Sequence, residues 1–316
     1  HEMETRWKEI GQYLSDFMVS QGLDPISSKE MTVWPGMELM SALFYIEEFK
    51  KSGQYDVVVM DTAPTAETLR LLSFPDTADW YFDKMYKVFR NTVRLARATV
   101  GKVMSMPMPT DAFLKDLDLL KDRMKAVRQI LLDAETTSVR LVVNPERMVI
   151  NETKRAYTYL CLYNLTVECL VINRLLPEEA RGQYPDAEFE EQSRYMQMID
   201  ESFSPLKMLR AYQSPTEVVG VRSLELLADQ LFGDTDPAVV YSSEKSMEIF
   251  NRDGVDTLAL KLPFSSKDQV ELYKSEDVLI VTVGWYKRSV ALPYSLVKKQ
   301  AHKAEFKDGR LMISFK

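Results

Sequence analysis

The sequence has few cysteines and histidines and no long apolar run. Two cysteines and two histidines among 316 residues leave little room for a disulfide framework or for a metal site of soft ligands. We therefore expect no zinc and a reducing, cytoplasmic compartment. No apolar run approaches the roughly 20 residues that a membrane span requires, and the first residues do not resemble a signal peptide. These absences predict a soluble protein.

The chain also lacks a basic excess and is poor in glycine. Its 40 Lys and Arg face 47 Asp and Glu, which gives a net charge of −7. A surface that binds nucleic acid usually carries a basic excess, so we expect no nucleic acid partner. The 11 glycines are about half of the average share. By contrast, 17 methionines are many, and methionine is favoured where a surface adapts to varied apolar partners.

Strand-like and helix-like segments alternate in the first two thirds of the chain. Short apolar or β-branched runs bounded by turn residues predict buried strands, and apolar residues at helical spacing predict helices. The expected strands are 57–60, 138–143, 167–172 and 206–211, and the expected helices are 2–20, 37–51, 147–162 and 221–231. This alternation predicts an α/β fold with a parallel sheet flanked by helices.

Two further segments depart from this alternation. Residues 74–133 form a helical insertion with two expected long helices, 78–103 and 111–133. After a linker at 234–245, the segment 246–316 has short alternating strands and turn dipeptides, which predict an antiparallel β-sandwich. We therefore predict an α/β domain over 1–233 and a β domain over 246–316.

Asp61 and the threonines after it are the first candidates for chemistry. Asp61 follows an expected buried strand, and ligands of open α/β sheets bind at the carboxyl ends of the strands. A carboxylate there could hold Mg²⁺ through water beside nucleotide phosphates, with Thr62 and Thr65 within reach of a phosphate or its attacking water. Alternatively, Asp61 caps the next helix and the threonines are turn residues.

Several motifs, in family order, resemble one ATPase family. DTAPT at 61–65, followed by TLRLLSFP, resembles switch II of the arsenical pump-driving ATPases and of the related ATPases that target tail-anchored membrane proteins. Further matches are PGME at 35–38, NPER at 144–147, VINRLLP at 171–177 and EVVG at 217–220. LALKLPF, VLIVTVGWYKRSVALP and DGRLMISF are similar to the α-crystallin-like domain fused to the C-terminus in one bacterial and plastid branch of that family.

The resemblance implies a P-loop NTPase-like fold with ATP and Mg²⁺ as cofactors. It assigns the catalytic role to Asp61, Thr62 and Thr65. Asp61 would also hold Mg²⁺ through water. It makes Asn173 the residue that hydrogen-bonds adenine, with Arg174 beside it in the cofactor-binding group. Tyr212 departs from the family pattern, because it stands where the family has proline five residues before the Glu of EVVG; we expect it to stack on adenine and so to join this group. Alternatively, Asn173 caps a helix or a turn, and Tyr212 is only a packing residue.

Three departures from the family pattern bear on activity. Ala66 and Glu67 stand where the family has Gly-His, and the C-x-x-C pair that holds zinc between subunits is absent. No G-x-x-x-x-G-K-[ST] occurs, and the one Gly-Lys pair, Gly101-Lys102, falls in an expected helix. Since residue 1 is His, we expect the N-terminal strand and phosphate loop to be missing from this chain, which would then be inactive alone. The alternative is a natural pseudo-ATPase.

The helical insertion is the second candidate for function. Apolar residues at helical spacing predict an adaptable groove for an apolar client, lined by Met85, Phe89, Phe113, Leu117, Leu120 and Met124. Residues 84–103 contain basic residues and no acid, and a basic amphipathic helix can also lie on an anionic membrane. The alternative is a solvated helix that pairs with the acidic residues of the next helix.

The residues and the resemblance together predict a homodimeric ATPase. It would couple ATP binding and hydrolysis to the binding and release of an apolar client, such as a membrane-protein segment, or to an anion pump, with transient membrane contact. The C-terminal module would be a packing or chaperone-like interaction domain. The alternative is a nucleotide-independent holdase or a pseudo-ATPase binding module. In a plant, the expected compartment is the plastid stroma rather than the cytoplasm.

Overall fold

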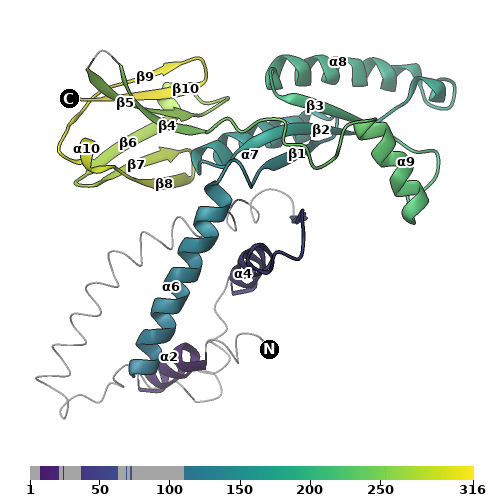
Figure 1. The fold of residues 1–316 in the computed structure, drawn as a ribbon. Helices are drawn as coiled ribbons and strands as arrows, with labels where there is room; N and C mark the ends of the chain where they lie inside the picture. The colour runs from purple at the N-terminus through teal and green to yellow at the C-terminus, as the bar shows by residue number, and fades with distance from the viewer. Residues whose placement is uncertain are drawn as a thin grey trace, which may run out of the picture. The chain divides into compact units, whose positions relative to one another are not determined.

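The chain forms two compact units in the computed structural model (Figure 1). The structure describes residues 8–20, 24, 37–62, 69, 72, 110–252 and 254–316. The first unit is formed by His1–Thr62 and Arg70–Ile130, and the second unit by Ala63–Leu69 and Leu131–Lys316. The second unit therefore includes the C-terminal strands together with the α/β region before them.

The described part of the first unit contains the helices α2 (Lys8–Ser20), α4 (Met37–Ser52) and α6 (Asp111–Leu132), the last of which ends in the second unit. The rings of Tyr13 in α2 and Phe113 in α6 lie 4.4 Å apart. Arg123 of α6 lies 4.2 Å above the ring of Phe44 in α4. Its guanidinium donates a 2.6 Å hydrogen bond to the buried carboxylate of Glu47. Helix α6 therefore packs against both other helices.

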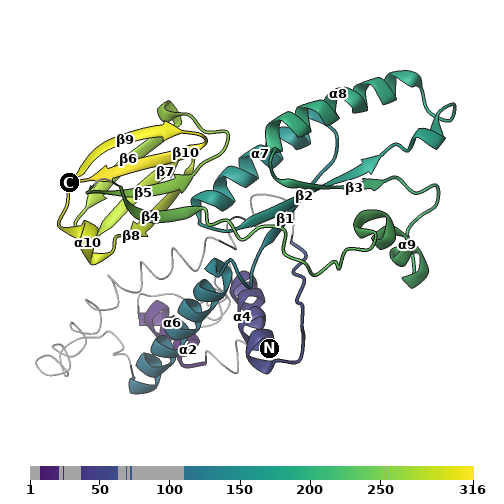
Figure 2. The same ribbon diagram turned by 45° about the horizontal axis from the view of Figure 1, so that its top comes forward.

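A three-stranded parallel sheet lies in the second unit. Strands β1 (Val139–Val143), β2 (Val167–Leu175) and β3 (Lys207–Tyr212) lie in the order β1-β2-β3. Helices α7 (Arg147–Leu162), α8 (Asp186–Phe203) and α9 (Val221–Phe232) alternate with them, and a 3-10 helix, η1 (Glu178–Ala180), precedes α8. Helix α7 lies against β1 and β2, and α9 lies against β3 (Figure 2). The predicted α/β fold with a parallel sheet is confirmed.

The burial of β2 and α7 explains why the apolar patterns predicted them. Cys169, Leu170 and Ile172 of β2 are completely buried, as expected for a strand between two neighbours in a covered parallel sheet. In α7, the buried residues Ile150 and Tyr157 are seven positions apart and therefore lie on one face of the helix. Among the helices within the described residues, none is long and apolar enough to cross a membrane.

The C-terminal strands form two antiparallel sheets. They are β4 (Met247–Arg252), β5 (Val255–Lys261), β6 (Val270–Ser275), β7 (Val278–Val283), β8 (Tyr286–Ala291), β9 (Ala301–Lys307) and β10 (Arg310–Phe315), with the short helices η2 (Lys267–Gln269) and α10 (Tyr294–Val297). One sheet has the order β4-β5-β10-β9 and the other the order β6-β7-β8. Along β10, every second residue is buried, so one face of that sheet packs on the core. The predicted antiparallel β fold of this segment is confirmed.

Helix α7 and the C-terminal strands are joined by buried hydrogen bonds. Arg288, 2% exposed, donates a 2.6 Å hydrogen bond to the carbonyl of Leu162, the last residue of α7. A cation at that end also complements the helix dipole. The hydroxyl of Thr158 donates to the carbonyl of Pro263, and that of Ser246 to the carbonyl of Leu165 at 3.0 Å. The predicted domain boundary at the linker therefore stays a prediction, because residues on both sides of it share one compact unit.

The predicted strand at residues 57–60 is wrong. These residues have irregular backbone, and Val57, Val58 and Val59 are 57%, 46% and 87% exposed. A strand needs a neighbour that pairs with its backbone groups, and no described residue pairs with this segment. The apolar composition of this segment therefore indicates a propensity for β-strand structure, but it does not show that a neighbouring strand pairs with the segment.

Candidate functional site

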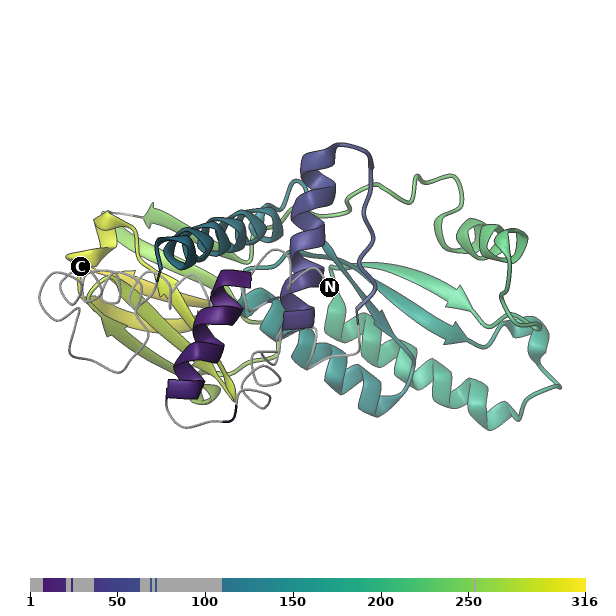
Figure 3. The ribbon, with the colours of Figure 1, turned by 90° about the horizontal axis from the view of Figure 1, so that it is seen from below.

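The three predicted cofactor-binding residues lie at the carboxyl ends of two neighbouring strands of the parallel sheet. Asn173 and Arg174 lie near the carboxyl end of β2, and Tyr212 is the last residue of β3. Leu175 pairs with Tyr212, so the two strands end side by side, toward the end of the sheet at which α9 lies (Figure 3). Asn173 is half-buried, Arg174 is exposed and Tyr212 is 39% exposed. Asn173 is part of β2, and its role stays a prediction.

Gln192 of α8 fixes the chain that leaves β2. Its side-chain oxygen accepts a 2.6 Å hydrogen bond from the backbone N–H of Leu176, and its amide nitrogen donates to the carbonyl of the same residue at 3.2 Å. Arg174, two residues earlier, has a left-handed backbone with φ of 58°, which costs a non-glycine residue about 1 to 2 kcal/mol. The paired hydrogen bonds to Leu176 help to hold this unfavourable conformation next to Asn173.

Gln230 of α9 fixes the end of β3 in the same way. Its side-chain oxygen accepts a 2.9 Å hydrogen bond from the backbone N–H of Tyr212, and the N–H of Gln213 donates to the carbonyl of Leu175 at 2.7 Å. Helix α9 begins after Gly220, whose φ of 82° favours glycine. The sequence analysis missed Gln192 and Gln230. No local signal marks a helical glutamine whose partner is the backbone of another element.

The predicted catalytic residues lie elsewhere in the chain. Asp61 is exposed and Thr62 is half-buried, and both belong to the first unit, whereas the residues at the sheet edge belong to the second. Thr65 lies outside the described residues, as do the predicted client-binding residues Met85 and Phe89. The structure therefore describes the adenine half of the predicted site and the first two residues of its catalytic half.

The described part of the predicted client-binding stripe is more buried than we expected. Phe113 is 5% exposed and Met124 is 1% exposed, whereas Leu117 and Leu120 are half-buried. Phe113 and Met124 are therefore core residues of the first unit, and their side chains do not line an open groove in this structure. A role of the stripe in client binding stays a prediction.

The two cysteines are buried apolar residues. Cys161 and Cys169 are 1% and 0% exposed, and both are free thiols. Burial raises the pKa of each thiol to about 11, which disfavours the thiolate that binds metal or arsenic. Within the described ranges, no three His, Cys, Asp or Glu side chains form a group that could hold a metal ion.

Comparisons with known proteins identify relatives of both parts of the chain. A family model described as "Anion-transporting ATPase" matches residues 1–233, and one described as "HSP20-like domain found in ArsA" matches residues 253–315. The "Putative arsenical pump-driving ATPase 1" of Aquifex aeolicus is 32% identical over 99% of this chain and 80% of its own length. The "Putative arsenical pump-driving ATPase" of Chlorobaculum tepidum is 34% identical over 99% of this chain and 78% of its own length. The "ATPase GET3C" of Arabidopsis thaliana is 31% identical over 63% and 52%.

Proposed function

Because this chain belongs to the anion-transporting ATPase family, we propose that its protein binds and hydrolyses ATP with Mg²⁺ and holds the adenine base at the carboxyl edge of β2 and β3. The pairing of Leu175 with Tyr212 is the observation that carries the proposal. It brings Asn173 and Tyr212 to neighbouring strands at the edge where open α/β sheets bind their ligands.

The three residues at this edge offer complementary contacts to a nucleotide. The side-chain amide of Asn173 has both a donor and an acceptor, and such a pair can bind one edge of adenine through two hydrogen bonds. The ring of Tyr212 is partly exposed and offers a face on which a base can stack. Arg174 is exposed beside them, so its guanidinium would reach ribose or phosphate oxygens.

Asp61, Thr62 and Thr65 are the residues that we propose to act at the phosphates. The exposed carboxylate of Asp61 is a hard oxygen donor of the kind that holds Mg²⁺ directly or through water. Magnesium, when bound, would neutralise the negative charge of the transferred phosphoryl group. The hydroxyls of Thr62 and Thr65 would hydrogen-bond the γ-phosphate or orient the attacking water.

We further propose that the protein is a homodimer that couples hydrolysis to an apolar client, such as a membrane-protein segment. Switch II leads directly into the helical insertion, so a nucleotide-dependent movement of that loop would be passed to the insertion, of which α6 is the described helix. On α6, the half-buried Leu117 and Leu120 are the described stripe residues that a client could contact. An anion pump is the second candidate, on the resemblance to the arsenical pump-driving ATPases.

Asn173→Ala in the full-length protein tests the adenine site. Losing the paired hydrogen bonds should weaken ATP binding by about 1 to 3 kcal/mol, so we expect calorimetry to give a dissociation constant roughly tenfold higher. Discrimination against GTP should fall as well. Asn151→Ala is the matched control, because Asn151 is exposed on α7. Equal ATP affinity in both variants would remove Asn173 from the site.

Asp61→Asn in the full-length protein tests the catalytic half. We expect ATP turnover to be nearly abolished while the circular dichroism spectrum is unchanged, because the exposed side chain supports no core contact. Asp56→Asn, an exposed carboxylate five residues earlier in the same segment, should leave turnover unchanged. Normal turnover in Asp61→Asn would contradict the switch II assignment, and client capture without nucleotide would favour a holdase.

A further inference from the structure

Strand β2 carries a bulge of one residue near its carboxyl end. Along β2, the pairing with β3 passes from Ile172 to Leu175, which is three positions. Along β3, it passes from Arg210 to Tyr212, which is two positions. The extra residue lies in the segment 173–174, whose second residue has the left-handed backbone with φ of 58°. Bulges are frequent beside active sites, where they re-aim a side chain. The bulge therefore sets how the proposed adenine contact is presented at this edge.

The bulge is held on both sides. Ile172, before it, is completely buried. Leu175, after it, is also buried, and its carbonyl accepts a 2.7 Å hydrogen bond from the N–H of Gln213. Gln192 of α8 then holds Leu176 by one hydrogen bond in each direction, at 2.6 and 3.2 Å. A left-handed residue other than glycine persists only where its surroundings over-determine it. The two bonds of Gln192 therefore oppose relaxation of the bulge from outside the sheet.

We propose that Gln192 is a positioning residue for the nucleotide base, because it holds the bulge in the form that presents Asn173 to adenine. This inference rests on the proposed function, since it takes Asn173 as the adenine contact. Without Gln192, the bulge would populate other backbone forms, and the affinity for ATP would fall with the fraction of molecules that keep the competent form. Adenine and guanine carry different donors and acceptors, so a misplaced Asn173 amide would also discriminate less between ATP and GTP.

Gln192→Met in the full-length protein tests this role, because methionine keeps the length and helix propensity of the side chain but makes neither hydrogen bond. We expect calorimetry to give an ATP dissociation constant about fivefold higher and a smaller change for GTP. Gln197→Met is the matched control, since Gln197 is exposed on the same helix and bonds within it to Glu201 at 2.8 Å. It should change neither constant. Equal weakening for ATP and GTP in Gln192→Met, or no weakening, would overturn the positioning role.

Combining Gln192→Met with Asn173→Ala distinguishes this inference from the proposed function. If Gln192 acts through Asn173, the double variant should bind ATP within about twofold of Asn173→Ala alone, because residues that act as a unit are not additive. Multiplied losses would mean that Gln192 acts on another contact. If Asn173→Ala weakens ATP binding and Gln192→Met does not, only the positioning role is wrong. If Asn173→Ala leaves ATP binding unchanged, the proposed adenine site fails and the positioning role fails with it.

Hydrogen exchange without nucleotide tests whether Gln192 holds the backbone at the bulge. The amide of Leu176 should exchange about tenfold faster in Gln192→Met, because it loses its acceptor. Unchanged exchange there would show that Gln192 does not hold the bulge. If Gln192→Met does not fold, Gln192→Glu keeps an acceptor for this amide and should lower the preference for ATP over GTP by a smaller factor; an unchanged preference would overturn the inference.

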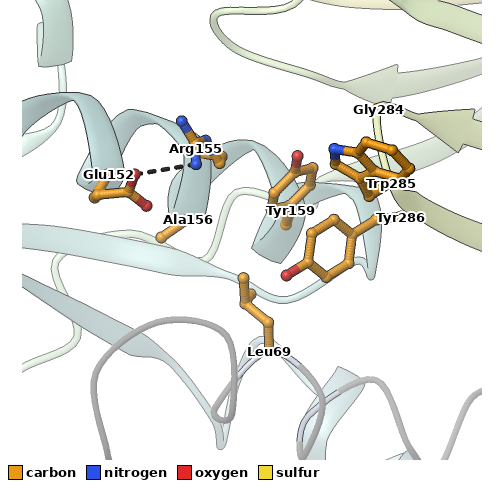
Figure 4. A pocket seen from close by; sticks show the side chains of 8 residues that line it. All are labelled: Leu69, Glu152, Arg155, Ala156, Tyr159, Gly284, Trp285 and Tyr286. Carbon is orange, nitrogen blue, oxygen red and sulfur yellow. Dashed lines mark ion pairs between the residues drawn. The ribbon is translucent and has the colours of Figure 1, made fainter.

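The turn that joins β7 to β8 provides the internal control for this exchange measurement. It lines a pocket of about 630 Å³ in the same unit, where the rings of Tyr159 and Tyr286 lie 3.9 Å apart (Figure 4). The pocket shares no residue with the bulge. Exchange at residues 283–287 should therefore stay unchanged in Gln192→Met. Equal acceleration at the turn and at Leu176 would mean that the whole unit is loosened, and the positioning role would be wrong.

Discussion

Met124→Ala tests whether α6 buries its apolar face or offers it to a partner. Met124 is 1% exposed, and Val127 and Leu131, three and seven residues later on the same face, are 0% and 5% exposed. Truncating a fully buried methionine to alanine costs about 2 to 5 kcal/mol, because a cavity remains where the side chain was. We expect the free energy of unfolding of the first unit to fall by at least about 2 kcal/mol.

Leu119→Ala is the matched control, because Leu119 lies on the same helix and is 52% exposed. Its effect should stay within about 0.5 kcal/mol. Native-state hydrogen exchange of the α6 amides measures the opening free energy of this unit separately from that of the second. If Met124→Ala costs no more than Leu119→Ala, the burial argument is refuted and Met124 belongs to a partly wet groove.

A peptide-capture assay, used together with the hydrogen-exchange measurement, separates packing from client binding along α6. The described stripe residues that remain available to a client are the half-buried Leu117 and Leu120. Leu117→Asp should therefore reduce the capture of an apolar peptide while costing less stability than Met124→Ala. Unchanged capture would leave the client-binding part of the proposed function without support from α6.

Three further predictions concern the second unit. Glu168 is 2% exposed and accepts hydrogen bonds from the guanidinium of Arg140 at 2.6 Å and from a linker amide at 2.8 Å. Glu168→Ala should therefore cost about 1.5 to 3 kcal/mol in urea denaturation. Glu178→Ala, which breaks an exposed pair, should have no measurable effect. Cys161 and Cys169 should resist a thiol reagent at neutral pH until the protein unfolds, since burial raises their pKa values to about 11. Burial disfavours the charged form of Glu244, but its hydrogen bonds with Lys261 and Arg310 lower the pKa of the carboxyl below 4.5. The ionised carboxylate therefore stabilises the fold above about pH 4.5, and this stabilisation is lost on acidification. Glu244→Gln should accordingly make the Tm fall less steeply below about pH 5.

Segments with clear periodicity were predictable from the sequence. The apolar spacing in residues 147–162 and the short apolar runs at 167–172 and 278–283 marked α7, β2 and β7, because buried residues recur at helical spacing in α7 and form short apolar runs in the two strands. Helix α8 was not predicted. Of its 18 residues, three are buried, Phe189, Ile199 and Phe203, and a face with so few apolar residues gives a weak periodic signal.

The candidate site was predictable only in part, for a different reason. Asn173 and Tyr212 follow strand-like runs, so their place at one sheet edge can be read from the chain. Gln192 and Gln230 hold the backbone there, but their hydrogen bonds join residues that are 16 and 18 positions apart in the sequence. These bonds form only once the helices have packed on the sheet. Residues 57–60 show the opposite case. Their sequence has a strong strand propensity, but no strand among the described residues pairs with them.

The hydrogen bonds between α7 and the C-terminal segment give this helix contacts in both the α/β region and the antiparallel region. Cutting the chain after residue 245 would leave the carbonyl of Leu162 without its bond from Arg288 and uncover the ring of Tyr159 that now lies against Tyr286. The C-terminal strands thus cover part of the surface of α7. A swap of this module between relatives would succeed only if α7 were exchanged with it.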